Sequence, residues 1–302
     1  MRMGDCRNVM RKFLLLWLGL ISSLAVGLAA CSTQAEAPRP DYLAAVLSQD
    51  LSVGPQRLTF LVLDPEREQM QVPEAEVTTY FLGGDRDAEG ERRETAMALF
   101  RSWPVGDTGL YSARFDFADA GIWRVEVNIT LPEQAPRTVT GFFRVSERSF
   151  TPVIGSDAPR SDTKTVSDVA SLQEITSSPD PDPALYQVSV AEAVTSGKAT
   201  VIAFSTPAFC STATCGPQLQ VVRELQGSYG ERVNFIHVEI YDNPHEIKGN
   251  LQNATRAEAV YEWGLPNEPW TFVVDGDGKV ADKFEAYTTR EELEESLLRV
   301  IG

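Results

Sequence analysis

Residues 200–219 read TVIAFSTPAFCSTATCGPQL, and this stretch joins a predicted strand to a predicted helix with two cysteines at the junction. Thr200–Ser205 is an apolar run, which is typical of a central strand covered on both faces. Apolar residues recur at helical spacing over Pro217–Gln226, and Gly227 follows as a stop signal. The stretch therefore predicts a buried strand that leads directly into a helix.

The two cysteines, Cys210 and Cys215, lie where a helix N-terminus can stabilise a thiolate. Residues five apart on a regular helix are about 7.5 Å apart along its axis. A disulfide needs Cα atoms within roughly 7 Å and side chains that face each other. Either Cys210 lies in the loop, or the first helical turn unwinds when the bond forms. Because proline is tolerated in a first turn, Pro217 favours a helix that begins near Cys215 with Thr214 as its cap.

Strands and helices alternate through residues 185–302. The patterns predict a helix over Val190–Ser196, a strand over Thr200–Ser205, a helix from Pro217, a strand over Val233–Ile240, a helix over Thr255–Trp263, strands over Trp270–Asp275 and Val280–Phe284, and a helix over Thr289–Ile301. Gly276–Gly278 (GDG) predicts a hairpin between the last two strands, and Thr289 is a candidate N-cap.

This order, with cysteines at the first strand-to-helix junction, resembles the thioredoxin fold. Phe209-Cys210 resembles the aromatic-Cys start of the thioredoxin active site, and Cys215–Gln218 (CGPQ) resembles its Cys-Gly-Pro-Cys core. Pro269 resembles the cis-proline beside that site. The resemblance implies thiol-disulfide exchange with protein thiols or disulfides, with Cys210 attacking, Cys215 resolving, and Phe209, Pro269 and Trp270 lining the substrate groove.

A second resemblance leaves the reaction open. Thr206-Pro207 with Cys210 and Cys215 is similar to atypical two-cysteine peroxiredoxins, which implies that Cys210 is peroxidatic and Cys215 resolving. The segment Leu265–Phe272 lacks the arginine that peroxiredoxins place there, which favours disulfide exchange. The strand that contains Ala203 lacks the buried acid of thioredoxins, for which Glu239 and Asp242 are candidate replacements.

Metal binding and a purely structural disulfide are the remaining alternatives. Sco-type copper chaperones share this fold and a cysteine pair, and copper(I) favours thiolate with imidazole. His237 lies within a predicted strand and is interpreted as a packing residue, whereas His245 follows a turn and is the weak metal-ligand candidate. We expect no cofactor. In a non-enzymatic surface-binding protein, which is the alternative, the disulfide would only stabilise the fold.

Residues 41–148 form a separate pattern of short strands divided by turns, which predicts an antiparallel β-sandwich. Tyr111 with residues 120–123 (AGIW) resembles immunoglobulin-like domains of bacterial surface proteins, which implies a spacer or a protein-binding module. Residues 149–184 contain prolines and acids and are expected to be an extended, solvated linker before the domain at 185–302. The segment IGSDAP at residues 154–159 resembles the entry segment of the thioredoxin superfamily, so the second domain can also begin near residue 153.

Residues 1–30 are expected to be a signal peptide rather than part of the fold, since a basic start precedes an apolar run and small residues. Cys31 follows them as in a bacterial lipobox, which implies cleavage before Cys31 and a lipid anchor on it; an uncleaved membrane anchor is the alternative. Residues 31–40 would be a tether. We therefore expect a membrane lipoprotein on the extracytoplasmic face, and the net charge of −16 argues against nucleic acid.

Overall fold

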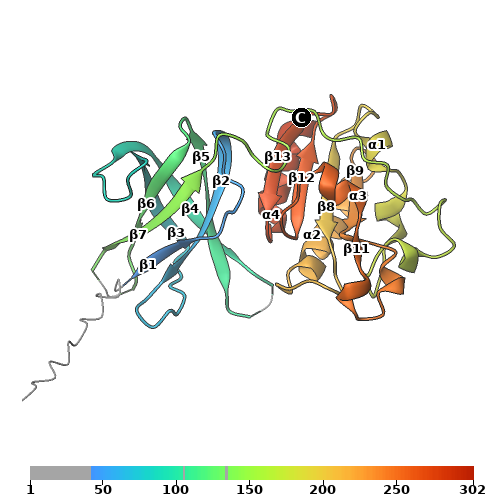
Figure 1. Cartoon of the computed structure of the whole chain (residues 1–302), viewed down its shortest axis with the longest axis horizontal. Coiled ribbons are helices and arrows are strands. Elements are labelled where there is room, and N and C mark those ends of the chain that lie inside the picture. Colours follow the sequence, from blue (N-terminus) through green and yellow to red (C-terminus); the bar gives the residue numbers. More distant parts are fainter. Residues whose placement is uncertain (1–41, 105, 133–134) are drawn as a thin grey trace, which may run out of the picture. The chain divides into compact units, whose positions relative to one another are not determined.

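The computed structural model describes residues 42–104, 106–132 and 135–302 (Figure 1). The predicted signal peptide, the tether and the lipid site at Cys31 lie outside the described residues. Within the described ranges, no helix is long and apolar enough to cross a membrane.

The N-terminal part of the described chain is an all-β domain. Its seven strands are β1 (Leu43–Val46), β2 (Gly54–Leu63), β3 (Glu74–Gly83), β4 (Glu91–Ser102), β5 (Gly109–Phe117), β6 (Gly121–Ile129) and β7 (Arg137–Val145). They hydrogen-bond in the order β1-β2-β5-β4-β3-β6-β7, and every pair is antiparallel. Two separate sheets were expected, but β4 joins all strands into one. It pairs with β3 up to Leu99 and with β5 from Leu99 onward.

The sheet folds over an aromatic core, and its first and last strands meet. Ser146, just after β7, donates its N–H to Leu51 O at 2.9 Å and accepts from Val53 N at 3.1 Å, both before β2. The enclosed cluster includes Trp123 and Phe117, whose rings lie 4.9 Å apart. Alternate strand residues face this core, so the domain buries its apolar side chains on one face of a single rolled sheet.

The C-terminal part has a thioredoxin-like topology. Its four-stranded sheet has the order β13-β12-β8-β9, with β8 (Thr200–Ser205) parallel to β9 (Asn234–Glu239). β12 (Trp270–Val274) and β13 (Val280–Glu285) form the predicted hairpin, and β12 is antiparallel to β8. A short ribbon, β10 (Tyr241–Asp242) with β11 (Thr255–Arg256), follows β9.

Helices cover both faces of this sheet (Figure 1). The helices are α1 (Val190–Ala193), α2 (Cys215–Tyr229), α3 (Glu258–Glu262) and α4 (Arg290–Ile301). Residues of α1 and α3 pack with Ile202 and Phe204 of β8, whereas those of α2 and α4 pack with Val201 and Ala203. All six residues of β8 are buried, as predicted for a central strand.

Two local predictions were wrong. α2 continues through Gly227 and ends at Tyr229, and the C-cap residue Gly230 donates its N–H to Gln226 O at 2.8 Å. A glycine costs only about 1 kcal/mol inside a helix, which is too little to end one packed on a sheet. Thr255 and Arg256 are not helical, because they pair with the strand at Tyr241–Asp242. The N-cap at Thr289 is confirmed, since its hydroxyl accepts from Glu292 N at 3.4 Å.

Residues 149–184 do not form an extended, solvated linker. Gly155 N bonds Val280 O at 2.7 Å, so this segment is attached to β13 from its start. Two 3-10 helices, Leu172–Glu174 and Pro183–Tyr186, follow. Ala158 and Ile175 of this segment are buried in the hydrophobic core of the thioredoxin-like domain, whereas Phe150 and Val153 are exposed.

Polar contacts also join the all-β domain to the thioredoxin-like domain. Arg57 of β2 makes two 2.8 Å bonds to the carboxylate of Glu292 in α4. Arg114 of β5 makes two bonds to Asp282 of β13, at 2.9 and 2.6 Å. The covalent connection is thus supplemented by ion pairs between residues far apart in the sequence.

Candidate functional site

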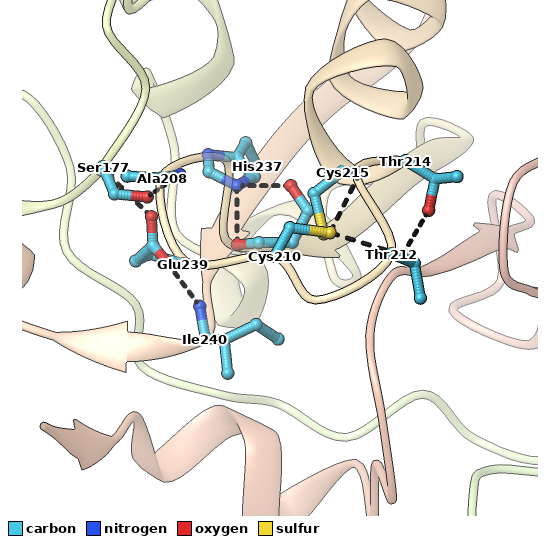
Figure 2. The surroundings of a disulfide bond; sticks show 10 residues. Ser177, Ala208, Cys210, Thr212, Thr214, Cys215, His237, Glu239 and Ile240 are labelled. Carbon is cyan, nitrogen blue, oxygen red and sulfur yellow. Dashed lines mark hydrogen bonds between the residues drawn. A yellow bond between two sulfur atoms is a disulfide. The ribbon is translucent and has the colours of Figure 1, made fainter. Parts of the chain in front are cut away.

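The cysteine pair lies at the end of β8, where the chain turns before α2 begins (Figure 2). Cys210 is in the loop and Cys215 is the first residue of α2, as predicted. They form a disulfide with their Cα atoms 6.0 Å apart. Ala213 has a φ of 58°, and this left-handed turn returns the chain to the helix. The separation of five residues is accommodated because only one cysteine is helical.

Thr214, the predicted N-cap of α2, does not cap the helix through its side chain. Thr214 occupies the N-cap position, but its side chain makes no capping bond. Its hydroxyl instead pairs with that of Thr212 at 2.7 Å, and Thr212 Oγ1 lies 3.4 Å from Cys210 Sγ. Cys215 N donates to Cys210 Sγ at 3.3 Å. The first N–H of α2 therefore points at the outer sulfur, where it would stabilise a thiolate.

The two cysteines differ in accessibility. Cys210 is half-buried, whereas Cys215 is 0% exposed. A partner molecule can therefore reach only the Cys210 side of the bond. This asymmetry is what an attacking cysteine and a protected resolving cysteine require.

Ser177 attaches the cysteine loop to β9 (Figure 2). Its Oγ accepts from Ala208 N at 3.1 Å, and its N–H donates to Glu239 Oε2 at 2.7 Å. Ile240 N also donates to this carboxylate, at 3.2 Å. Sequence reasoning missed Ser177 because it lay in the supposed linker; its contact partners are more than 30 residues away.

Glu239 is the acidic side chain best placed near this loop. It is 6% exposed, and burial raises its pKa, although the bonds from Ser177 and Ile240 oppose that rise. It also lines a cavity of about 220 Å³ together with His237 and Tyr241. Asp242, the other candidate, bonds Lys164 Nζ at 2.7 Å at the surface.

His237 is a packed strand residue, as predicted. Its Nε2 lies 2.9 Å from Ser205 Oγ and 3.1 Å from Ser205 O, and its Nδ1 lies 2.7 Å from the Tyr186 hydroxyl. Because burial disfavours the charged ring, the pKa of His237 is lowered to about 4. Both ring nitrogens are already bonded within the fold, so His237 has none to offer a metal.

His237 makes the fold sensitive to acid. The unfolded chain binds a proton near pH 6.5 and the folded chain only near pH 4, so stability is lost as the pH falls through this window. The difference corresponds to about 3 kcal/mol. In His237→Gln, the free energy of unfolding measured with urea should no longer show this loss between pH 7 and 4. His245→Gln, at a half-exposed site, should keep it; equal pH dependence in the two variants would contradict the prediction.

Pro269 is buried and directly precedes β12. The Glu268–Pro269 peptide bond is cis, and the register Trp270↔Phe204 places Pro269 at the end of the sheet where β8 enters the loop. Trp270 does not line a groove, contrary to expectation. It is 1% exposed, stacks on Phe272 at 5.8 Å and donates to Asn267 Oδ1 at 2.6 Å. As the first residue of β12 it is drawn into the core cluster by its large apolar ring.

Phe209 is half-buried and meets Tyr241 edge-on, with their ring centroids 5.9 Å apart. Glu268 and Arg256 act electrostatically on Tyr241, so they belong to the same neighbourhood. Burial raises the pKa of Glu268, and Arg256 opposes this rise. Phe209, next to Cys210 in the chain, therefore forms an aromatic pair with Tyr241, which has an acidic and a basic neighbour. Tyr241, Arg256 and Glu268 were not predicted, because they come from β10, from β11 and from the segment before Pro269, which are separated in the sequence.

His245 lies in a 3-10 helix, Pro244–Glu246, with its ring 3.8 Å from Glu246 Oε1. Among residues 42–104, 106–132 and 135–302, no group of three or more His, Cys, Asp or Glu side chains is arranged to hold a metal ion.

Comparisons with known proteins add a fold-level likeness. No family model matches the chain, and the search of curated proteins found no match. A putative thiol:disulfide interchange protein DsbE from Chlorobium tepidum is 15% identical with a TM-score of 0.37, over 50% of this chain and 100% of its own. A thioredoxin-family thiol:disulfide interchange protein from Chlorobium tepidum TLS is 15% identical with a TM-score of 0.35, over 50% and 99%.

The exposed lipoprotein thioredoxin Etrx1 of Streptococcus pneumoniae strain TIGR4 is 12% identical with a TM-score of 0.27, over 35% of this chain and 87% of its own. At these identities and TM-scores, no activity transfers to this chain. The thioredoxin-like topology is given by its own strand order and helix placement.

Proposed function

We propose that the chain is a membrane-anchored, extracytoplasmic thiol-disulfide oxidoreductase that acts on protein thiols or disulfides. The observation that carries this proposal is the asymmetry of the pair. Cys210 is reachable and accepts the first N–H of α2, whereas Cys215 is enclosed at the start of the same helix. A closed ring of six residues constrains the unfolded chain little, so this disulfide contributes little to the stability of the fold.

In the reaction, the Cys210 thiolate attacks one sulfur of a partner disulfide and releases the other as a thiolate. The resulting mixed disulfide joins Cys210 to the partner. The Cys215 thiolate then attacks Cys210 Sγ and releases the partner's second thiolate. Two electrons pass from the cysteine pair to the partner, and the pair ends as the disulfide described above. The reverse sequence oxidises a partner dithiol.

Proton transfer would fall to Glu239. Ala203, on the central strand, offers no acid, and Glu239 is buried, has a raised pKa and is joined to the loop through Ser177. Such a carboxyl can take up a proton from a thiol near neutral pH. Phe209, which is half-buried beside Cys210, would contact the partner, whereas Pro269 is buried.

The anchor and the first domain complete the proposal. Lipid on Cys31 would hold the chain at the membrane, and the all-β domain would act as an immunoglobulin-like spacer. Its strand order, with β4 shared between two halves, supports that interpretation. Fatty-acid labelling that is lost in Cys31→Ala would support the anchor; labelling that persists would contradict it.

The decisive experiment is a titration of thiols on the folded protein. Mild dithiol should expose two thiols, at Cys210 and Cys215, while tryptophan fluorescence and circular dichroism stay native. The reduced protein should then lose both thiols on mixing with a disulfide-bonded protein. A pair that resists reduction until the chain unfolds would instead identify a non-enzymatic protein with a structural disulfide.

A further inference from the structure

Gln218 is a fully buried polar side chain one helical turn beyond Cys215. Both residues are 0% exposed and both belong to α2. Residues three apart on a helix are neighbours on its surface, with Cβ atoms about 5–6 Å apart. The Gln218 side chain therefore lies on the same side of α2 as Cys215, one turn along the helix.

The orientation of this amide is determined by its surroundings. Thr288 N donates to the Gln218 side chain at 2.7 Å, so the atom that accepts must be Oε1. The Nε2 group then points away from Thr288. It is buried and has no hydrogen-bond partner among the described residues. Since buried donors are nearly always bonded, this unpaired N–H calls for a partner.

The first turn of α2 provides few other donors for Cys215. Cys215 N is bonded to Cys210 Sγ, Pro217 has no N–H, and Gln218 N is bonded to Thr214 O at 2.8 Å. A thiolate at Cys215 would also be cut off from water, which disfavours its charge. In the disulfide its sulfur is uncharged and a weak acceptor, which explains why Nε2 is unpaired in that state.

We propose that Gln218 Nε2 donates a hydrogen bond to the Cys215 thiolate once the disulfide has opened, and that this bond sets the rate at which Cys215 resolves the mixed disulfide. The inference rests on the proposed exchange reaction and adds a residue to it. Stabilising the thiolate raises its population at neutral pH. That gain exceeds the accompanying loss of nucleophilicity while the thiol pKa lies above the ambient pH.

The test measures the pKa of Cys215 without requiring exchange. In full-length protein carrying Cys210→Ser, the pH dependence of the Cys215 Cβ carbon chemical shift in NMR spectra reports its pKa, separately from the other cysteines and without a reagent having to reach the buried sulfur. Adding Gln218→Met removes the donor and should raise this pKa by about one to two units, as expected for a bond to a charged group. Gln220→Met is the matched control on the same helix, since Gln220 is exposed and bonds only Glu224 at 3.1 Å.

A second readout follows the reaction itself. With Cys210 restored, the mixed disulfide between Cys210 and a small aromatic thiol should last roughly tenfold longer in Gln218→Met than in Gln220→Met. If Gln218→Met fails to fold, Gln218→Glu serves instead, because it keeps the acceptor for Thr288 N and replaces the amide donor by a group that becomes negative. It should also raise the pKa of Cys215.

An unchanged Cys215 pKa in the folded Gln218 variants would overturn the inference and leave Gln218 with a structural role only. Failure of the exchange proposal appears elsewhere, as a wild-type disulfide that mild dithiol cannot reduce. The two failures are therefore distinguishable.

Discussion

Cys210→Ser should abolish disulfide exchange, with turnover falling to the level of the double variant that lacks both thiols. Cys210 is the half-buried sulfur that a partner can reach, and Cys215 is enclosed at the start of α2. No other group in the loop can attack a disulfide, because exchange needs a thiolate. The measurement is the rate at which the reduced variant reduces a disulfide-bonded protein.

Cys215→Ser should behave differently. Cys210 can still attack, but nothing resolves the intermediate, so the variant should accumulate covalent complexes through Cys210. Non-reducing gels and mass spectrometry would identify these complexes, and a reductant should dissolve them. Equal trapping by Cys210→Ser and Cys215→Ser would contradict the assigned roles, and trapping only by Cys210→Ser would reverse them.

Glu292→Ala should lower the free energy of unfolding by about 3–5 kcal/mol, because it leaves Arg57 buried without its partner. The two side chains are only 7% and 3% exposed and share two 2.8 Å bonds. Ser112 Oγ also donates to Glu292, at 3.1 Å. Burial raises the pKa of Glu292, but attraction to Arg57 and the bonds it receives outweigh this, and the net pKa is lowered. The carboxylate is therefore ionised where it holds the two domains together.

Guanidinium unfolding followed by fluorescence would measure this loss. Because the Arg57–Glu292 pair joins the all-β domain to the thioredoxin-like domain, we expect two unfolding transitions in Glu292→Ala where the wild-type protein shows one. The double variant Arg57→Met/Glu292→Met should lose less than Glu292→Ala alone, because no charge is left unpaired. Glu295→Ala is the control; its 3.5 Å contact with Arg299 is exposed and should contribute less than about 1 kcal/mol. A loss at Glu292 no larger than that at Glu295 would contradict the assignment.

Sequence reasoning succeeded wherever the deciding interactions are local. The run at Thr200–Ser205 predicted a central strand, and all six of its residues are buried. The geometry of a disulfide excluded two cysteines within one regular helix, and Cys210 is indeed in the loop while α2 begins at Cys215. The Gly276–Gly278 turn predicted the hairpin of β12 and β13. Such signals depend only on neighbours in the chain.

Sequence reasoning failed where residues distant along the chain decide the outcome. Residues 149–184 looked solvated because prolines and acids dominate them, yet Ile175 is buried and Ser177 bonds Glu239, 62 residues away. Trp270 directly follows the cis-proline, as a residue of the substrate groove would, but its ring is packed in the hydrophobic core. No periodic pattern in the sequence indicates that this segment or the Trp270 ring packs against the core.

The sequence by itself determined the order of the main strands and helices, the position of the cysteine pair at the N-terminus of a helix and the place of Cys210 in the loop before that helix. Only the tertiary structure decided which sulfur is reachable, that Ser177 and Glu239 hold the loop, and that Gln218 keeps an unpaired donor beside Cys215. The reason is physical. Backbone geometry and periodicity act between neighbours, whereas burial and hydrogen-bond partners depend on segments that meet only after the chain has folded.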